Sequence, residues 1–290
     1  MSALALTRRP NGKATGLLIA GVLIFGVTPA RAHRLEKRFK VDTHPVITIH
    51  NPDGMVTVKA WTRREVMVVA NHGSEKVEVD AEQVGNRVDI MTHQLVDTIA
   101  PEDMRADYEV SVPEDAELQI HNDSGAVSVA NVLGDMNVET VAAGVELADT
   151  AGYLTVKTIG GSFQCVRCAG RIEVSSISGS FRLLDLRSLH VRAQTSTGNI
   201  LFSGEFLPNG IYKLKNYSGV IEVRFSPADS FDLSATSLKG KVVNEANLTP
   251  PAHRRFFSRI GNSLFGSINS GRAKVDLTSF DGTINILKRQ

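Results

Sequence analysis

The stretch Gly152–Leu183, GYLTVKTIGGSFQCVRCAGRIEVSSISGSFRL, holds two copies of one unit. Gly152-Tyr-Leu-Thr-Val recurs as Gly170-Arg-Ile-Glu-Val, and Gly161-Ser-Phe-Gln-Cys recurs as Gly179-Ser-Phe-Arg-Leu, each after 18 residues. Two series of short segments are therefore interleaved. Within each segment the apolar residues alternate with polar ones, which is typical of a β-strand with one buried face.

Both series continue through most of the chain. Further members are Gly134-Asp-Met-Asn-Val in the first series and Gly125-Ala-Val-Ser-Val, Gly144-Val-Glu-Leu and Gly198-Asn-Ile-Leu-Phe in the second. Later members are Gly219-Val-Ile-Glu-Val, Gly240-Lys-Val-Val and Gly282-Thr-Ile-Asn-Ile, and the last interval, of 42 residues, is two coils long. A Ser, Thr or Asn precedes most of these Gly residues by three or four positions, where its side chain can bond the backbone of a turn. These polar residues are Asn122, Thr140, Thr158, Ser176, Thr195, Asn216, Thr236 and Ser279.

Short strands every 8 to 10 residues fit two architectures, an antiparallel meander or barrel and a parallel solenoid. Each strand resembles the strand two places on rather than its immediate neighbour. A solenoid explains this resemblance, because it stacks equivalent positions of successive coils in ladders, whereas a meander does not. The sequence therefore predicts an all-β fold, a parallel β-solenoid (β-helix) with coils of about 18–21 residues.

The regions outside the regular repeat are predicted to cap or interrupt the stack. Residues 33–118 are β-rich but less regular, which predicts an N-terminal β-layer cap, although Ile47–Val58 already matches Leu118–Val129. The solenoid domain is predicted at residues 119–290. Within it, residues 248–266 break the coil spacing, so we expect an insertion loop there.

The insertion loop carries basic and aromatic side chains. The spacing of Phe256, Ile260 and Leu264 is compatible with a short amphipathic helix after Pro251. One interpretation is a docking element for a partner or an anionic surface, and the other is a loop whose aromatic residues cover the end or flank of the stack. The candidate docking residues are Arg254, Arg255, Phe256, Phe257 and Arg259.

The first 32 residues have the pattern of a signal peptide. Residues 7–13 are basic, residues 14–27 are almost continuously apolar, and residues 30–32 (Ala-Arg-Ala) supply the small residues of a cleavage site. The apolar run is shorter than the roughly 20 residues that a spanning helix needs. Arg8-Arg9 raises twin-arginine export, but the polar Pro-Asn-Gly that follows favours ordinary secretion. We expect cleavage before His33, no transmembrane segment afterwards, and a location in the periplasm, at the cell surface or outside the cell.

The charge balance argues against a polybasic nucleic-acid binder. The 290 residues carry 32 Lys and Arg against 31 Asp and Glu, but four of the basic residues lie in the predicted signal peptide. The remaining chain has 28 basic and 31 acidic residues, a net charge of −3. We therefore expect no nucleic acid among its partners.

Cys165-Val-Arg-Cys168 has the spacing of a redox pair. A redox thiol needs a helix N-terminus or a similar environment to lower its pKa, and the repeat instead places this motif at the end of a strand. The 18-residue offset equates the two Cys with Leu183 and Leu186, which are core-type positions. Two buried small residues, or a disulfide bond formed in an oxidising envelope, are the favoured interpretations.

The remaining polar residues predict no catalytic, cofactor or metal site. His50 and His121 occupy equivalent repeat positions, which indicates a shared turn geometry more than a site. The outward row of the first series is predicted to mix charges without an acid pair, and one Trp in the chain offers few platforms for stacking on a sugar. We therefore expect no enzyme activity. The predicted row is Asn137, Thr155, Glu173, His190, Lys213 and Asp232.

The interleaved [Thr/Ser/Asn]-x-x-Gly-x-Val-x-Val units behind a signal peptide resemble the bacterial putative-adhesin family of β-strand-repeat envelope proteins, a domain family of largely unknown function. The likeness covers about residues 40–290, and the insertion at 248–266 departs from a uniform repeat. The resemblance implies a β-solenoid with an adhesive or interaction role, and it supplies no catalytic residues.

The leading hypothesis is an exported, non-enzymatic adhesin-like or scaffold protein, whose sheet faces bind another protein or a cell-wall glycan. The first alternative is a periplasmic regulatory or sensing module of an envelope-stress pathway. The second alternative is a glycan-active β-helix enzyme, since parallel β-helices also carry polysaccharide lyases and hydrolases.

Overall fold

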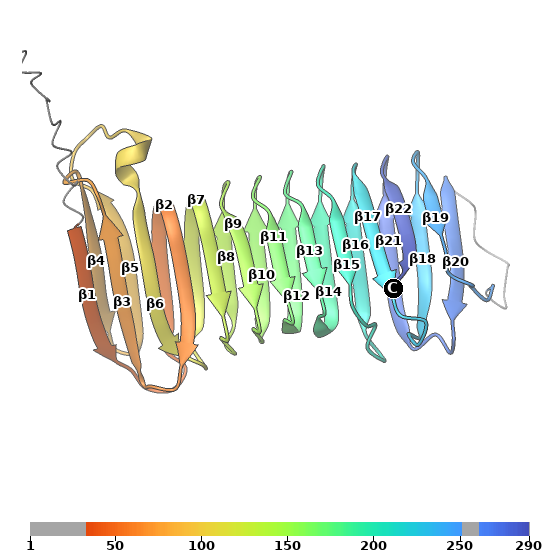
Figure 1. Ribbon diagram of the computed structural model, residues 1–290, viewed down its shortest axis with the longest axis horizontal. Coiled ribbons are helices and arrows are strands. Elements are labelled where there is room, and N and C mark those ends of the chain that lie inside the picture. The colour runs from red at the N-terminus through yellow and green to blue at the C-terminus, as the bar shows by residue number, and fades with distance from the viewer. Residues whose placement is uncertain (1–32, 251–260, 290) are drawn as a thin grey trace, which may run out of the picture. The chain divides into compact units, whose positions relative to one another are not determined.

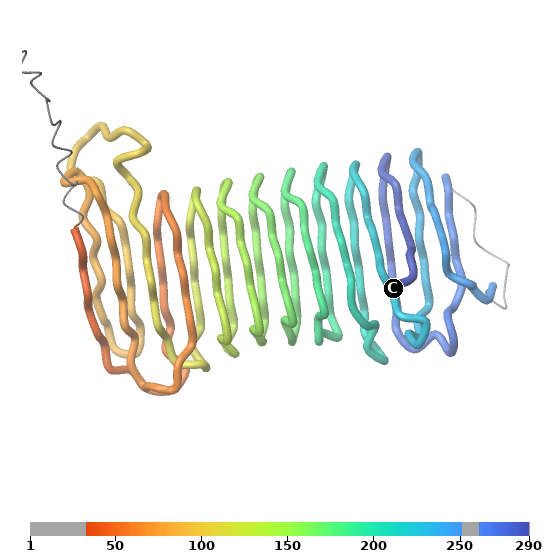
Figure 2. Tube along the Cα trace, viewed as in Figure 1, coloured from red at the N-terminus to blue at the C-terminus, as the bar shows by residue number. Residues whose placement is uncertain are grey.

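The computed structural model describes residues 33–250 and 261–289, and residues 32–290 cluster as one compact unit. The described residues form 22 strands and one short 3-10 helix, η1 (Pro101–Met104). Figure 1 shows the strands side by side in a row from β1 to β20, and Figure 2 shows the chain winding from one coil to the next. The prediction of an all-β parallel solenoid is confirmed.

Each regular coil places one strand in each of two layers, here called the first and the second sheet. The first sheet contains β8 (Met136–Thr140), β10 (Tyr153–Thr158), β12 (Ala169–Ser176), β14 (Arg187–Thr195) and β16 (Ile211–Asn216). The second contains β9 (Gly144–Ala148), β11 (Phe163–Val166), β13 (Phe181–Leu184), β15 (Ile200–Ser203) and β17 (Val220–Phe225). From β8 to β15 each strand pairs in parallel with the strand two places on, so Leu154 pairs with Met136 on one side and with Ile172 on the other.

The core lies between the two sheets and consists of ladders of apolar side chains. Leu154 and Ile172 are neighbours in one ladder, and the rings of Phe163 and Phe181 meet edge to face in another, with centroids 6.2 Å apart. Because neighbouring strands are about 4.8 Å apart, equivalent side chains of successive coils touch. A single coil cannot bury its own apolar row, so each coil depends on its neighbours.

At the corner between β14 and β15, where the chain passes from the first sheet to the second, one hydroxyl side chain holds the turn. The Thr195 hydroxyl accepts the N–H of Gly198 (3.2 Å) and donates to the carbonyl of Gly179 in the preceding coil (3.0 Å). One side chain therefore fixes both the turn and the stacking of two coils. In the coil that contains Gly240 this residue is the buried Ser237 rather than the predicted Thr236. Thr158, Ser176 and Ser279 accept the N–H of a Gly in the same way.

The N-terminal end of the stack is covered by antiparallel strands. Its strands are β1 (His33–Lys40), β2 (Val46–Trp61), β3 (Glu65–His72), β4 (Val77–Val84), β5 (Arg87–Gln94), β6 (Ala106–Pro113) and β7 (Glu117–Ala130). The long strands β2 and β7 run parallel through both sheets, and β5 and β6 form the coil beyond β2. β4 pairs antiparallel with β5, β3 with β6, and β1 with β3. The predicted boundary after residue 118 falls within β7.

The last coil in the sequence is not the last coil in space. The C-terminal strands are β18 (Phe231–Ser237), β19 (Val242–Asn244), β20 (Asn262–Ile268), β21 (Ala273–Ser279) and β22 (Thr283–Lys288). β21 pairs in parallel with both β16 and β18, and β22 pairs in parallel with both β17 and β19. The coil formed by β21 and β22 is thus inserted out of sequence order. The dark blue trace of this coil stands between lighter strands in Figure 2.

The predicted insertion loop at residues 248–266 is wrong at its C-terminal end. Residues from Asn262 onward form β20, which pairs antiparallel with β18. This pairing supplies partners for backbone groups that the edge of β18 would otherwise expose. Residues 251–260 lie outside the described residues, and with them the start of the helix proposed after Pro251.

The signal peptide predicted at residues 1–32 also lies outside the described residues. Within residues 33–250 and 261–289, no helix is long and apolar enough to cross a membrane.

Candidate binding surface on the first sheet

The outward side chains of the first sheet form rows that run across the strands. The central row is Asn137, Thr155, Glu173, Arg192, Lys213, Asp276 and Ser234. The predicted row is therefore wrong at His190 and Asp232. His190 pairs with Arg171, because β14 has one extra residue at a register shift between Gly170 and Arg171. Asp232 pairs with Lys274, because β21 is inserted beside β18.

Four exposed basic residues gather where β14, β16 and β21 lie side by side. Arg192, Lys213, Lys215 and Lys274, here called the cationic patch, form no ion pair with any described residue. Nearer the N-terminal end the same sheet pairs its cations, as in Lys157–Glu139 at 3.0 Å. The patch therefore carries positive charge that no ion pair holds, although the chain after residue 32 is acidic overall and Glu173, Asp276 and Asp232 lie on the same or neighbouring strands.

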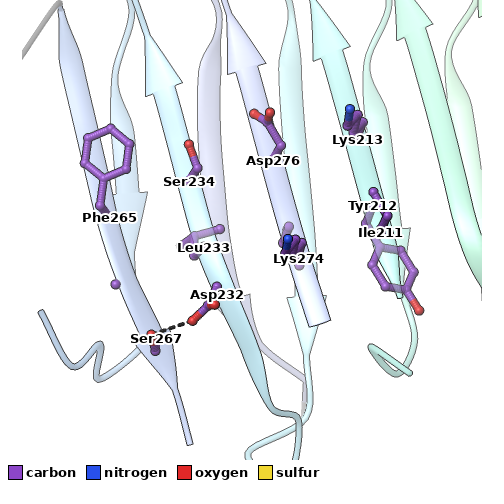
Figure 3. A pocket seen from close by; sticks show the side chains of 12 residues that line it. Ile211, Tyr212, Lys213, Asp232, Leu233, Ser234, Phe265, Ser267, Lys274 and Asp276 are labelled. Atoms are coloured by element: carbon purple, nitrogen blue, oxygen red, sulfur yellow. Dashed lines mark hydrogen bonds between the residues drawn. The ribbon is translucent and has the colours of Figure 1, made fainter. Parts of the chain in front are cut away.

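The carboxylates beside the cationic patch are bound to other groups. Glu173 forms an ion pair with Arg171 (2.6 Å), which holds the pKa of Glu173 below its ordinary value. Asp276 accepts a hydrogen bond from the hydroxyl of Thr278 (3.1 Å). Asp232 accepts one from Ser267 (2.6 Å), as Figure 3 shows. None of these carboxylates neutralises a residue of the patch by direct contact.

A shallow groove of about 730 Å³ adjoins the cationic patch across β16, β21, β18 and β20. Lys213 and Lys274 line one part of it, and Phe265 of β20 lines the other (Figure 3). Two smaller hollows share Arg192 and Lys213: one of about 180 Å³ lies across β12, β14 and β16, and one of about 100 Å³ lies across β14, β16 and β21. These hollows give the C-terminal half of the first sheet an extended, open surface instead of an enclosed pocket.

The chemistry of this surface is that of binding. It offers guanidinium and ammonium donors, the hydroxyls of Ser234 and Ser267, and the apolar side chains of Ile211 and Phe265. Asp232 lies beside Lys274, and Asp276 lies beside Lys213, in the register of the strands. Among the described residues no three His, Cys, Asp or Glu side chains are grouped to hold a metal ion.

Asp229 is a buried carboxylate away from this surface. It accepts the backbone N–H groups of Ser226 (2.8 Å) and Phe206 (3.4 Å) in the turn before β18. Burial raises the pKa of Asp229, and the two N–H bonds act in the opposite direction. Its contacts assign it to the turn.

Cys165 and Cys168 form a disulfide bond, and both side chains are fully buried. Cys165 pairs with Leu183 of β13, as the repeat offset predicts. The sulfur atoms are part of the core, and the disulfide closes a loop of only a few residues.

The rings of His50 and His121 stack at the N-terminal end of the first sheet, with centroids 4.7 Å apart. His121 also lies 3.0 Å from a carboxylate oxygen of Asp123. Partial burial lowers the pKa of His50, and the neighbouring His121 and His93 lower it further, while Asp123 raises it. The repeat predicted that the two His occupy equivalent positions. The structure shows that these positions are neighbours on adjacent strands, so that the two rings are in contact.

An exposed apolar column follows the corners between the two sheets. Ser196 interrupts it after Thr195, and Phe280 is only partly exposed. Its members each come directly after a polar corner residue: Val141, Ile159, Ile177, Tyr217, Phe280 and Leu238. The rings of Tyr217 and Phe280 stack at 4.6 Å, and the Lys239 ammonium lies 4.9 Å from the centre of the Phe280 ring. Sequence reasoning missed this column, although its members can be found in the sequence as the apolar residues directly after a corner Ser, Thr or Asn. The docking residues predicted at 254–259 lie outside the described residues.

Comparison with known proteins gives one family and three solved structures. The family model described as Toastrack DUF4097 matches residues 45–287. A putative adhesin from Bacteroides fragilis is 11% identical over 89% of this chain and 97% of its own, with a TM-score of 0.43. A putative cell adhesion protein from Clostridium sporogenes is 12% identical over 89% and 100%, with a TM-score of 0.29. A putative adhesin from Parabacteroides merdae is 9% identical over 88% and 96%, also at 0.29.

No curated protein matches the sequence. At TM-scores below 0.5 the three solved structures superpose only loosely on this chain, so what it binds has to be argued from its own residues.

Proposed function

The chain belongs to the Toastrack DUF4097 family, and from this premise we propose that it is an exported, non-enzymatic, adhesin-like scaffold protein that holds a partner on the outward surface of its first sheet. The observation that carries the proposal is the cationic patch, whose charges have no ion-pair partner among the described residues and stand beside an open groove.

The rigidity of the sheet supports a role in presentation. Arg192, Lys213 and Lys274 project from strands whose inward neighbours, such as Val191 and Leu214, are buried in the core. Parallel pairing on both sides of β14, β16 and β21 fixes the spacing of these side chains. A surface that is already ordered loses little conformational entropy when a partner binds.

Export is supported by two independent features. The first is the signal-peptide pattern of residues 1–32. The second is the Cys165–Cys168 disulfide, because disulfide bonds persist mainly in oxidising compartments such as the periplasm or the exterior of the cell. No observation on the described residues favours a sensing module or a glycan-active enzyme over the scaffold role.

A deletion strain tests this proposal. We expect the strain to lose adhesion or envelope integrity and to regain it with the wild-type gene or with Arg182→Glu. We expect no recovery with the double variant Arg192→Glu/Lys213→Glu. Arg182 is an exposed cation on β13 of the second sheet, so its reversal makes the same kind of change, at a single residue, on the opposite face. Normal adhesion and envelope integrity in the deletion strain would contradict the proposed function.

A further inference from the structure

The geometry of the first sheet suggests the chemical class of the partner, an inference that rests on the proposed function. Two hollows follow one another from β12 to β20 across the strands, and a third lies beside them on β14, β16 and β21. Neighbouring strands are about 4.8 Å apart, so a chain lying across them meets a new outward side chain at each step. A linear polymer that runs along the stack fits this layout better than a compact ligand.

The polymer must carry negative charge at intervals. Arg192 and Lys213 are direct neighbours in the central row, while Lys215 and Lys274 lie one outward position away along β16 and β21. Asp276 continues the central row beside Lys213, and Asp232 lies beside Lys274. These two carboxylates repel an anionic group placed beside them, so the polymer must set its own carboxylates on the cations and its neutral hydroxyl and ring groups beside Asp276 and Asp232.

The groups between the charges are suited to sugars. Ser234, Ser267 and Thr278 place hydroxyl oxygens near the cationic patch, and Gln194 adds an amide on β14. Ile211, which is 36% exposed, supplies an apolar contact for the C–H face of a sugar ring. Cations, hydrogen-bonding groups and apolar side chains thus alternate on one open surface.

We propose that the partner is a linear acidic polysaccharide, whose carboxylate groups bind the cationic patch while its sugar hydroxyls and ring faces contact the groove beside Ile211 and Ser234. Binding is non-covalent, and the glycan leaves the surface unchanged.

Fluorescence anisotropy with labelled polygalacturonate tests the inference on the purified full chain. We expect binding that weakens as salt is added, because the contacts are between exposed charges. Arg192→Glu and Lys213→Glu should each weaken binding by about tenfold, the effect of losing a charged hydrogen bond. Arg182→Glu should leave the affinity unchanged, and equal unfolding midpoints of the three variants would show that each one folds.

Three probes separate this class of partner from others. Methyl-esterified polygalacturonate and dextran, which lack the charge, should not bind. Polyglutamate, which has the charge but no sugar, should bind far more weakly, and equal affinity for it would overturn the inference in favour of charge alone. Absence of polygalacturonate binding, or equal loss with Arg182→Glu, would also overturn it.

The outcome is distinguishable from failure of the proposed function. If adhesion depends on Arg192 and Lys213 but polygalacturonate does not bind, the class of partner is wrong and the scaffold role stands. If the deletion strain adheres normally, the scaffold role is wrong whatever the polysaccharide result.

Discussion

At the residue scale, the corners of the stack depend on close approach between backbones. A Cβ atom added at Gly198 would overlap the carbonyl oxygen and carbon of Gly179 in the neighbouring coil. The same corner carries the two hydrogen bonds of Thr195. A methyl group at this position must therefore push two coils apart or break the corner.

We expect Gly198→Ala to lower the free energy of unfolding by about 1–3 kcal/mol, the usual cost of overpacking. Gly73→Ala is the matched control, because a Cβ at Gly73 meets nothing within 4 Å. Urea unfolding followed by circular dichroism measures both variants. Equal midpoints for Gly198→Ala and the wild type would show that the two coils can move apart at this corner without loss of stability, which contradicts the prediction.

The stacked pair His50 and His121 makes stability depend on pH. The pKa of His50 is lowered from its ordinary value of 6.5, so the folded protein favours the neutral ring. Below about pH 6.5 the unfolded chain binds the proton more readily than the folded one, and stability falls as the pH falls. The contribution of His50 is complete above its unfolded pKa and is lost as the pH drops through the lowered folded pKa.

We expect the wild type to lose more stability between pH 7.5 and pH 5 than His50→Gln, which has no proton to bind at this position. Carboxylates with lowered pKa values, such as Glu139 and Asp149, have ordinary pKa values of 4.5 and 3.8. In the folded protein they therefore change protonation below this pH window. Urea midpoints across the pH range provide the measurement. Parallel pH profiles for the two proteins would rule out the His50 effect.

At the element scale, the inserted coil determines whether the C-terminal strands can form. β18 pairs only with β20 and β21 among the described strands, and β19 pairs only with β22. The coil formed by β18 and β19 is therefore connected to the stack through strands that come later in the sequence. This coil can become ordered only after the later strands β20, β21 and β22 have formed beside it.

We expect a chain that ends at residue 250 to lose amide protection in residues 231–244, because all strand partners of β18 and β19 are then missing. Residues 136–203 should keep their protection, because each coil depends mainly on its neighbours. Hydrogen exchange followed by mass spectrometry distinguishes the two segments. Full protection of residues 231–237 in the shortened chain would mean that β18 pairs directly with the free edge of β16, so that its order does not depend on β21.

At the scale of the whole molecule, the described unit is a one-dimensional stack. Leu183 lies in the middle of it and is fully buried, whereas the next residue, Leu184, points outward and is partly exposed. We expect Leu183→Ala to cost about 2–5 kcal/mol, and Leu184→Ala to cost much less. In hydrogen exchange the loss of protection should be greatest in β11, β13 and β15 and should decrease toward both ends.

Chemical denaturation gives the two energies, and exchange gives the spatial profile. A uniform loss of protection from β1 to β20 would mean that the whole stack unfolds in a single cooperative step instead of coil by coil.

The repeat in the sequence predicted most of the regular part of the fold. The alternation in Gly152–Leu183 and the 18-residue offset predicted the parallel coils, their ladders and the pairing of Cys165 with Leu183. These features are local or periodic, and the length of a repeat shows which residues of successive coils lie above one another. The same reasoning placed His190 and Asp232 in the central row, where the structure has Arg192 and Asp276.

The cationic patch is the part that only the tertiary structure decided. Lys274 and Asp276 join Lys213 because β21 is inserted between β16 and β18, and Arg192 joins them because β14 has one extra residue. Both events depend on which strand edge is free when a later segment returns, and backbone groups at a free edge accept any strand of suitable length. The sequence by itself determined the repeat and its buried rows, because burial follows from alternation. The order of the last coils, and with it the charges of the binding surface, was decided by long-range pairing that periodicity does not encode.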